Sequence, residues 1–382
     1  MAGLRVEIAP ALLGWALRRS GADQDQLETK FPKLREWEAG ESSPTFKQLE
    51  KFAAATHTPL GSFFLSEPPA ESLPLPDFRT LGEQQIDEPS ADLIDAIGIV
   101  ERRQEWFAQF ARYIDREPLD FIGTLTLHTD EADAAKAIAE RLRFRPQDRR
   151  DLSSWEEALR SLIEHAEDAG ILVMVSGIVG SNTHRVLDTR EFRGFAIADA
   201  LAPVIFVNGA DAKSAQNFTV AHELAHLWLG MSGVSNVGPR TRDLAPIERW
   251  CNRVAAELLV PTDLITDEYD AKAAPEDEAV RLARIFKVSP EVILRRALEA
   301  KLIGWDAYEL ALAEEESRQR AASGASGGNF YYTLPVRTSK TFARAVIADA
   351  LEGRTLYRDA YRLLGLTKAE TFDRLTRELG VR

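Results

Sequence analysis

The residues best suited to chemistry in this chain lie in the run His222-Glu223-Leu224-Ala225-His226. Residues four apart share one face of a helix, so the imidazoles of His222 and His226 can both point at one metal ion. Glu223 lies beside them, where its carboxylate can reach a metal-bound water without binding the metal. Zinc lowers the pKa of such a water, and the carboxylate takes its proton as the water attacks a carbonyl. With only six histidines in the chain, we favour this zinc site over a chance spacing on a core helix.

A catalytic zinc ion also needs a third protein ligand and one open position. The helix predicted over Pro246–Leu259 offers Glu248, which shares a face with Asn252. We therefore expect Glu248 to be the third ligand and Asn252 to support the histidine ligands. The alternatives for the third ligand are Glu257, Cys251 and Asp243. Candidates for contacts with the oxyanion or the substrate, which no spacing supports, are His184, Tyr269 and Arg193.

The elements that must position these residues follow from the hydrophobic pattern. Short strands are predicted at Ile171–Val175, Phe192–Ala198 and Pro203–Asn208, and the metal-binding helix follows at Ala215–Gly230. The strand Pro203–Asn208 precedes that helix by a few residues. It is expected either to pair at its edge with an extended substrate or to be an ordinary central strand.

The whole chain is predicted to be a mostly helical α+β protein with several parts. A small helical domain (1–66) and a proline-rich linker (67–76) come first. A metallopeptidase domain with a helical N-terminal extension (77–312) follows. A flexible linker (313–328) then leads to a small helical C-terminal region (329–382).

The composition narrows the function classes. The formal net charge of −13 argues against charge-driven coating of nucleic acid or anionic membranes. A single cysteine excludes an internal disulfide and favours a reducing compartment. The first residues lack the features of a signal peptide, and the longest apolar runs are too short to span a bilayer. We therefore expect a cytoplasmic protein with no membrane partner.

Three blocks of the sequence resemble the ImmA/IrrE family of bacterial zinc metallopeptidases. They are the strands at residues 194–208, the segment Phe218–Leu227 and the segment Glu248–Pro261, and the likeness covers roughly residues 150–300. It implies a gluzincin-like fold in which two histidines and one glutamate bind one zinc ion per chain. It also implies limited cleavage of a specific regulatory protein of the repressor or antitoxin class. Many members carry a glutamate two residues before the asparagine; here Trp250 holds that place, and the ligand role passes to Glu248.

The N-terminal domain resembles the Xre-type helix-turn-helix of phage repressors in a degenerate form. The likeness lies in residues 13–21, 34–41 and 44–49, but the stretch between Leu27 and Trp37 is about four residues short of the usual motif. Residues 1–70 hold eight Lys/Arg against nine Asp/Glu, with no basic stripe. The sequence leaves open whether this domain binds DNA or instead contacts a partner toxin or the protein substrate. A second helix-turn-helix-like segment, Arg281–Arg296, is predicted to be structural.

Taken together, these patterns predict a cytoplasmic zinc-dependent regulatory endopeptidase in which Glu223 activates the zinc-bound water. The alternative is a non-proteolytic, antitoxin-like or transcriptional regulator that binds protein or DNA and has a structural or vestigial zinc site. The presence of Glu223 favours the enzyme, because a purely structural zinc ion does not need it.

Overall fold

The computed structural model describes residues 4–20, 24–69, 73–78, 89–236, 245–322 and 336–381. The chain divides into two compact units: Met1–Pro74 with Ile86–Gly98, and Leu75–Gln85 with Ile99–Arg382. As predicted, the protein is α+β and mostly helical, with one small sheet in the middle of the chain. No helix in the described ranges is long and apolar enough to cross a membrane.

The first unit contains a bundle of short helices: α1 (Pro10–Ser20), α2 (Gln24–Lys30), α3 (Leu34–Glu38), α4 (Phe46–Ala55) and the 3₁₀-helix η1 (Leu60–Phe64). Its core includes Phe31 and Trp37, which both pack against Phe52 with their rings nearly perpendicular to it. Helix α4 begins with a capping box, in which Thr45 and Gln48 satisfy each other's backbone groups. Helix α3, in the segment whose sequence resembles a helix-turn-helix, is only five residues long.

The second unit is built around a four-stranded mixed sheet in the order β1-β3-β2-β4. Strand β3 (Val204–Asn208) pairs in parallel with β1 (Leu172–Ser176) and antiparallel with β2 (Gly194–Ile197). The three-residue strand β4 (Gly233–Ser235) pairs antiparallel with β2. Because β3 has a strand on each side, the expectation that its edge is open to a substrate is wrong, and β3 is a central core strand.

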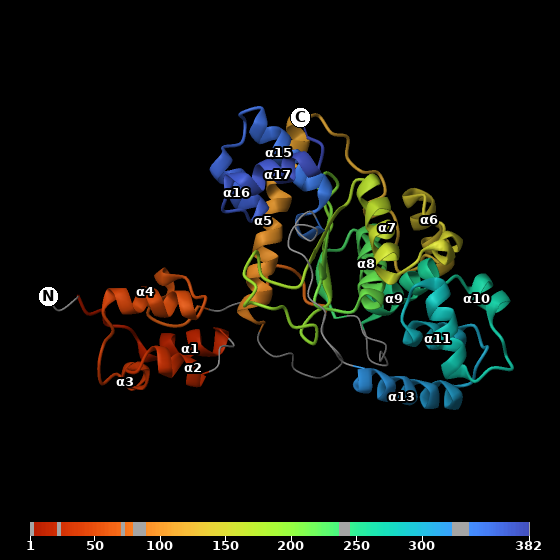
Figure 1. The fold of residues 1–382 in the computed structure, drawn as a ribbon, viewed down its shortest axis with the longest axis horizontal. Helices are drawn as coiled ribbons and strands as arrows, with labels where there is room; N and C mark the ends of the chain where they lie inside the picture. Colours follow the sequence, from red (N-terminus) through yellow and green to blue (C-terminus); the bar gives the residue numbers. More distant parts are fainter. Residues whose placement is uncertain are drawn as a thin grey trace. The chain divides into compact units, whose positions relative to one another are not determined.

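Helices α7 (Trp155–Asp168) and α8 (Lys213–Leu229) pack side by side against the sheet, with α7 on β1 and α8 on β2 and β3 (Figure 1). Helix α9 (Pro246–Leu259) packs on α8, and its apolar side chains share one core with both helices and the strands. The remaining elements around this core are α6 (Glu131–Leu142), η2 (Pro146–Asp151), α10 (Thr262–Glu268), α11 (Pro275–Phe286), α12 (Pro290–Glu299) and α13 (Trp305–Ala322). Helix α13 covers residues 313–322, which the sequence assigned to a flexible linker, and residues 323–328 lie outside the described ranges.

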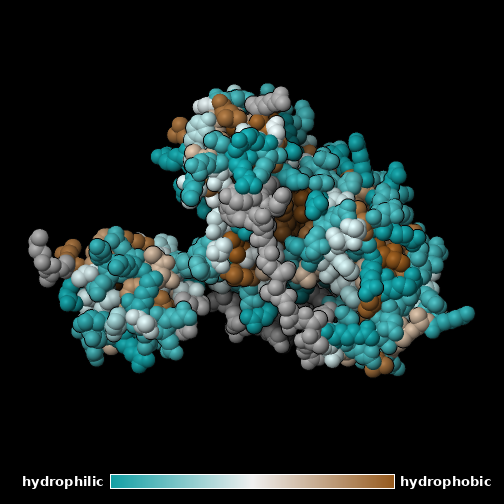
Figure 2. Space-filling model, viewed as in Figure 1, coloured by the Kyte–Doolittle hydropathy of each residue, from teal (hydrophilic) through white to brown (hydrophobic). Residues whose placement is uncertain are grey.

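The C-terminal helices α15 (Lys340–Leu351), α16 (Tyr357–Leu364) and α17 (Ala369–Glu378) form a small cluster beside α5 (Ala91–Tyr113). Phe342 packs against Trp106 and Phe107 of α5. The buried guanidinium of Arg103 donates to the backbone oxygen of Leu363 at 2.9 Å. Apolar side chains also reach the surface of this cluster (Figure 2), among them Leu351, Leu356 and Tyr357.

Candidate metal centre

Helix α8 carries three candidate residues in one buried turn. His222, Glu223 and His226 are each 0% exposed, because α8 lies between the sheet and α9 with apolar residues on almost every side. The helix ends at Leu229, and the positive φ of 69° at the next residue, Gly230, lets the chain turn towards β4. The spacing of four thus places both imidazoles on the side of α8 that faces α9.

Glu248 of α9 completes a cluster of three possible metal ligands. Its carboxylate oxygens lie 3.2 Å from Nε2 of His222 and 3.0 Å from Nε2 of His226. The two Nε2 atoms are 3.0 Å apart, and the ligand atoms all lie within 4.8 Å of one another. A tetrahedral zinc ion holds two nitrogen ligands roughly 3.3 Å apart, so this donor set suits zinc in both chemistry and spacing.

Asn252, one turn after Glu248, orients the first histidine. Its Oδ1 lies 2.9 Å from Nδ1 of His222. An amide oxygen accepts a hydrogen bond, so it favours the tautomer with a proton on Nδ1 and leaves Nε2 free to bind a cation. Nδ1 of His226 has no hydrogen-bond partner among the described residues, and this ring is instead covered by the ring of Phe78.

Glu223 is a buried carboxylate whose two oxygens make no hydrogen bond of ordinary geometry within the described ranges, although the hydroxyl of Ser235 is near enough to lower the pKa of Glu223 to a small extent. Burial raises the pKa of Glu223 well above its ordinary value, and the nearby Glu248 raises it further. Leaving such a group without donors is costly unless the site uses it. A cation held by the three ligands would stabilise the ionised form, because an opposite charge at this range lowers the pKa of a carboxyl group.

The pKa of Glu248 is shifted in the opposite direction to that of Glu223, so the ionised form of Glu248 is favoured. Burial alone would raise the pKa of its carboxyl, but the two imidazoles lower it to about 2. Burial also lowers the pKa of His226 and so favours the neutral ring. An ionised carboxylate and a neutral imidazole are the forms that bind zinc.

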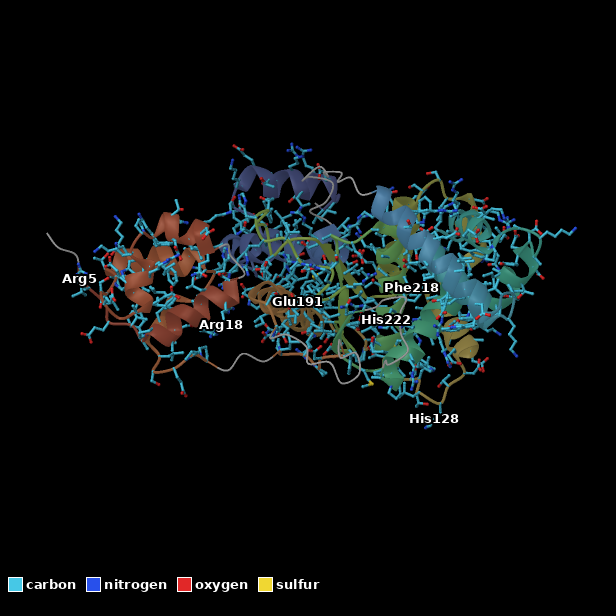
Figure 3. The ribbon with its side chains drawn as sticks, turned by 90° about the horizontal axis from the view of Figure 1, so that it is seen from below. Arg5, Arg18, His128, Glu191, Phe218 and His222 are labelled. Atoms are coloured by element: carbon cyan, nitrogen blue, oxygen red, sulfur yellow. The ribbon has the colours of Figure 1, made fainter. Side chains whose placement is uncertain are left out.

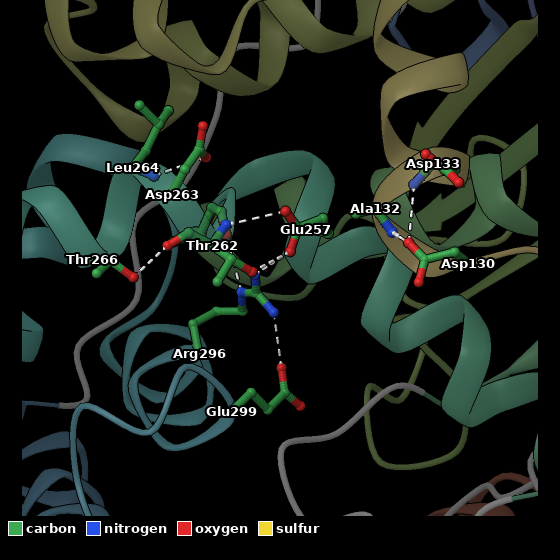
Figure 4. A network of polar contacts seen from close by, with 11 residues as sticks. Asp130, Ala132, Asp133, Glu257, Thr262, Asp263, Leu264, Thr266, Arg296 and Glu299 are labelled. Carbon is green, nitrogen blue, oxygen red and sulfur yellow. Dashed lines mark hydrogen bonds and ion pairs between the residues drawn. The ribbon is translucent and has the colours of Figure 1, made fainter.

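None of the alternatives for the third ligand that the structure describes belongs to the cluster. Glu257 accepts hydrogen bonds from the backbone and hydroxyl of Thr262 at 3.1 and 2.7 Å, and it pairs with Arg296 (Figure 4). It therefore holds the start of α10 and does not face the histidines. Cys251 is part of the hydrophobic core, and burial raises the pKa of its thiol well above the ordinary value. Asp243 lies outside the described residues.

The three predicted oxyanion or substrate contacts are not brought into the cluster. His184 is exposed in a loop, and the side chain of Tyr269 packs on the margin of the core. The guanidinium of Arg193 pairs with Asp211 at 3.4 Å. Figure 3 shows a further histidine, His128, at the surface far from His222.

Three further residues lie near the cluster, and the sequence pattern did not point to them. The hydroxyl of Ser235, at the end of β4, lies 3.4 Å from Nε2 of His226. Gly194 of β2 lies against α8, where an added Cβ would be 2.9 Å from Oε1 of Glu223. Phe78 stacks on His226. No motif marks these positions, because each depends on contacts made across the fold.

Comparison with known families covers part of the chain. Residues 166–298 match the family described as the IrrE N-terminal-like domain, which is a metallopeptidase family. This match supports the ImmA/IrrE resemblance and a metallopeptidase-like function in general, and the matched range contains α8 and α9. Residues 338–378 match a domain of unknown function. No curated protein matches the chain.

Proposed function

We propose that this protein is a zinc-dependent regulatory endopeptidase of the cytoplasm. One observation carries the proposal: a buried cluster of His222, His226 and Glu248 adjoins the fully buried carboxylate of Glu223, which makes no hydrogen bond of ordinary geometry in the described part of the chain. Four polar residues in an apolar core are costly to maintain, and such burial is typical of a functional site.

Each side chain has a role in this proposal. His222, His226 and Glu248 hold one zinc ion, and Asn252 fixes the orientation of the His222 ring. When bound at three protein ligands, zinc polarises a carbonyl group and lowers the pKa of water. Glu223 accepts a proton from the water that attacks the peptide carbonyl and returns it to the nitrogen of the leaving amine. The peptide C–N bond breaks, and the products are a carboxylate and an amine.

The substrate class rests on the resemblance to the ImmA/IrrE family. We propose a specific folded or partly folded regulator of the repressor or antitoxin class, and not bulk digestion. The N-terminal helical unit is proposed to recruit that substrate or a partner toxin. The small size of α3 favours protein contacts over reading of DNA, because a recognition helix must present several side chains to base edges.

The Glu223→Gln substitution tests the proposed chemistry. It keeps the size of the side chain but removes its ability to take a proton, so we expect cleavage to fall by at least about 100-fold. Zinc content should stay near one ion per chain, because Glu223 is not among the ligands. The measurements are metal analysis and cleavage of proteins encoded beside the gene, co-expressed with each variant.

Glu314→Gln is the matched control, since it makes the same change at an exposed position of α13. It should cleave like the wild type. If the wild type holds zinc yet cleaves none of these proteins, the peptidase proposal is wrong and a non-proteolytic regulator takes its place. Equal cleavage by the Glu223→Gln variant would contradict the role of Glu223.

A further inference from the structure

A short segment of the chain's own backbone is paired with the outer edge of the sheet. The segment is Pro76–Phe78, here called the strap. The backbone N–H of Phe78 donates to the oxygen of Val234 at 2.9 Å, and the N–H of Val234 donates to the oxygen of Pro76 at 2.9 Å. Asp77 forms the bridge opposite Val234, parallel to β4. The strap therefore uses both backbone groups that Val234 offers at this edge.

The side chain of the strap covers a proposed metal ligand. The rings of Phe78 and His226 are stacked, with centroids 5.4 Å apart and planes only 4° from parallel. The same ring lies directly on Gly233, where an added Cβ would be 2.1 Å from Cε2 of Phe78. Gly233 and His226 thus form a flat seat that an aromatic side chain fills.

This edge is the one beside the metal centre. Strand β4 ends at Ser235, whose hydroxyl is 3.4 Å from Nε2 of His226. Strand β1, at the other side of the sheet, is separated from β4 by β3 and β2. An extended peptide that pairs with a sheet edge next to the ligands must therefore use the backbone groups of β4.

We propose that the strap is an internal competitor for the peptide-binding edge of the protein. It holds Val234 and the aromatic seat on Gly233 and His226, so an extended peptide can bind there only after the strap leaves. This inference rests on the proposed function and adds to it a preference for an aromatic residue at the seat. The strap must be displaceable, since two backbone hydrogen bonds and one ring contact give only modest stability.

The composition of the strap suits this role. Pro76 of the strap, and Pro74 two residues before it, restrict the unbound conformations of the chain, so little entropy is lost when the strap pairs. Pro76 has no N–H, and it contributes only the carbonyl oxygen that Val234 requires. Phe78 then supplies the ring that fills the seat.

The test uses the full chain and a fluorescently labelled peptide with the sequence of residues 73–78. The Phe78→Ala variant leaves the seat empty, and we expect it to bind the peptide roughly tenfold more tightly than the wild type, because an intramolecular occupant lowers apparent affinity. Phe64→Ala is the matched control. It removes the same side chain from a position that is 56% exposed and outside the strap, so it should bind as the wild type does.

A second variant, Gly233→Ala, tests the proposal independently in case Phe78→Ala does not fold. Its new methyl group occupies the position of the Phe78 ring, so the strap should detach while the seat stays filled. We expect faster hydrogen exchange at the Val234 amide in both the Phe78→Ala and Gly233→Ala variants, but tighter peptide binding only in Phe78→Ala.

Equal peptide affinities for the wild type and Phe78→Ala, or unchanged exchange at Val234, would overturn the proposal. A fall in cleavage rate in Phe78→Ala would also overturn it, since loss of a competitor must raise the rate. Neither peptide binding nor exchange depends on hydrolysis. Tighter binding by Phe78→Ala with no cleavage by any variant would therefore support the strap and contradict the proposed peptidase.

Discussion

At the scale of single residues, the centre is defined by what each side chain contacts. Glu248 and Glu257 lie on the same helix, and both are largely buried carboxylates. Glu248 meets two imidazoles, whereas Glu257 meets a guanidinium and the start of the next helix. Two residues of the same type thus have separate roles, one for binding a cation and one for holding α10.

Alanine substitutions at these two positions should affect different properties, zinc affinity at Glu248 and stability at Glu257. Glu248→Ala should lower zinc affinity at least about 100-fold, since only two protein ligands remain. Glu257→Ala should keep zinc but lower the free energy of unfolding by about 2 kcal/mol, because Arg296 loses a largely buried partner. Metal titration and denaturant unfolding measure the two effects. Unchanged zinc affinity in Glu248→Ala would remove Glu248 from the site.

The sequence predicted the positions of these side chains where helical phase determines them. His222 and His226 meet because they are four apart, and Glu248 and Asn252 face the centre together for the same reason. The contact of Phe78 with His226 has no such rule. It depends on how a proline-rich segment pairs with β4, and that pairing cannot be predicted from the local sequence around residue 78.

At the scale of elements, the centre depends on how closely α8 approaches the sheet. The approach is set at Gly194 of β2, where an added Cβ would lie 2.6 Å from Cγ2 of Thr219 and 3.0 Å from the oxygen of Phe206. Glycine is therefore the residue that lets α8 lie on β2 with Glu223 against the strand. The sequence predicted β2 and α8, but it did not predict this contact, and it missed the three-residue strand β4 because no alternation is visible over so short a run.

The Gly194→Ala substitution should force α8 and β2 apart. Overpacking of this kind costs roughly 1–3 kcal/mol of stability, and it should also displace Glu223 from the proposed centre. We expect a lower melting temperature together with a loss of cleavage larger than the loss of folded protein. Gly304→Ala is a suitable control, since an added Cβ there meets nothing within 4 Å. Wild-type stability and activity in the Gly194→Ala variant would contradict this prediction, because α8 would then be able to shift away from β2 at no cost.

At the scale of the whole molecule, the proposed ligands all belong to one of the two units. His222, His226 and Glu248 lie on α8 and α9, within the unit formed by Leu75–Gln85 and Ile99–Arg382. The helices α1 to α4 have a separate core that contains Phe31, Trp37 and Phe52. The sequence predicted a boundary near the proline-rich segment, but the strap at its end belongs to the second unit and pairs with β4.

Removal of zinc should therefore weaken one unit and spare the other. A ligand that binds only the folded state adds about 2.7 kcal/mol of stability when its free concentration is 100 times Kd. For a unit of this size the gain corresponds to a rise in Tm of roughly 5 °C. Hydrogen exchange with and without a chelator would locate the effect, with faster exchange in α8 and α9 and unchanged exchange in α4. The chelator should have no effect on a His222→Ala, His226→Ala double variant. Equal destabilisation of α4 would contradict the prediction, because it would mean that the N-terminal core unfolds together with the metal-binding unit and is not an independent one.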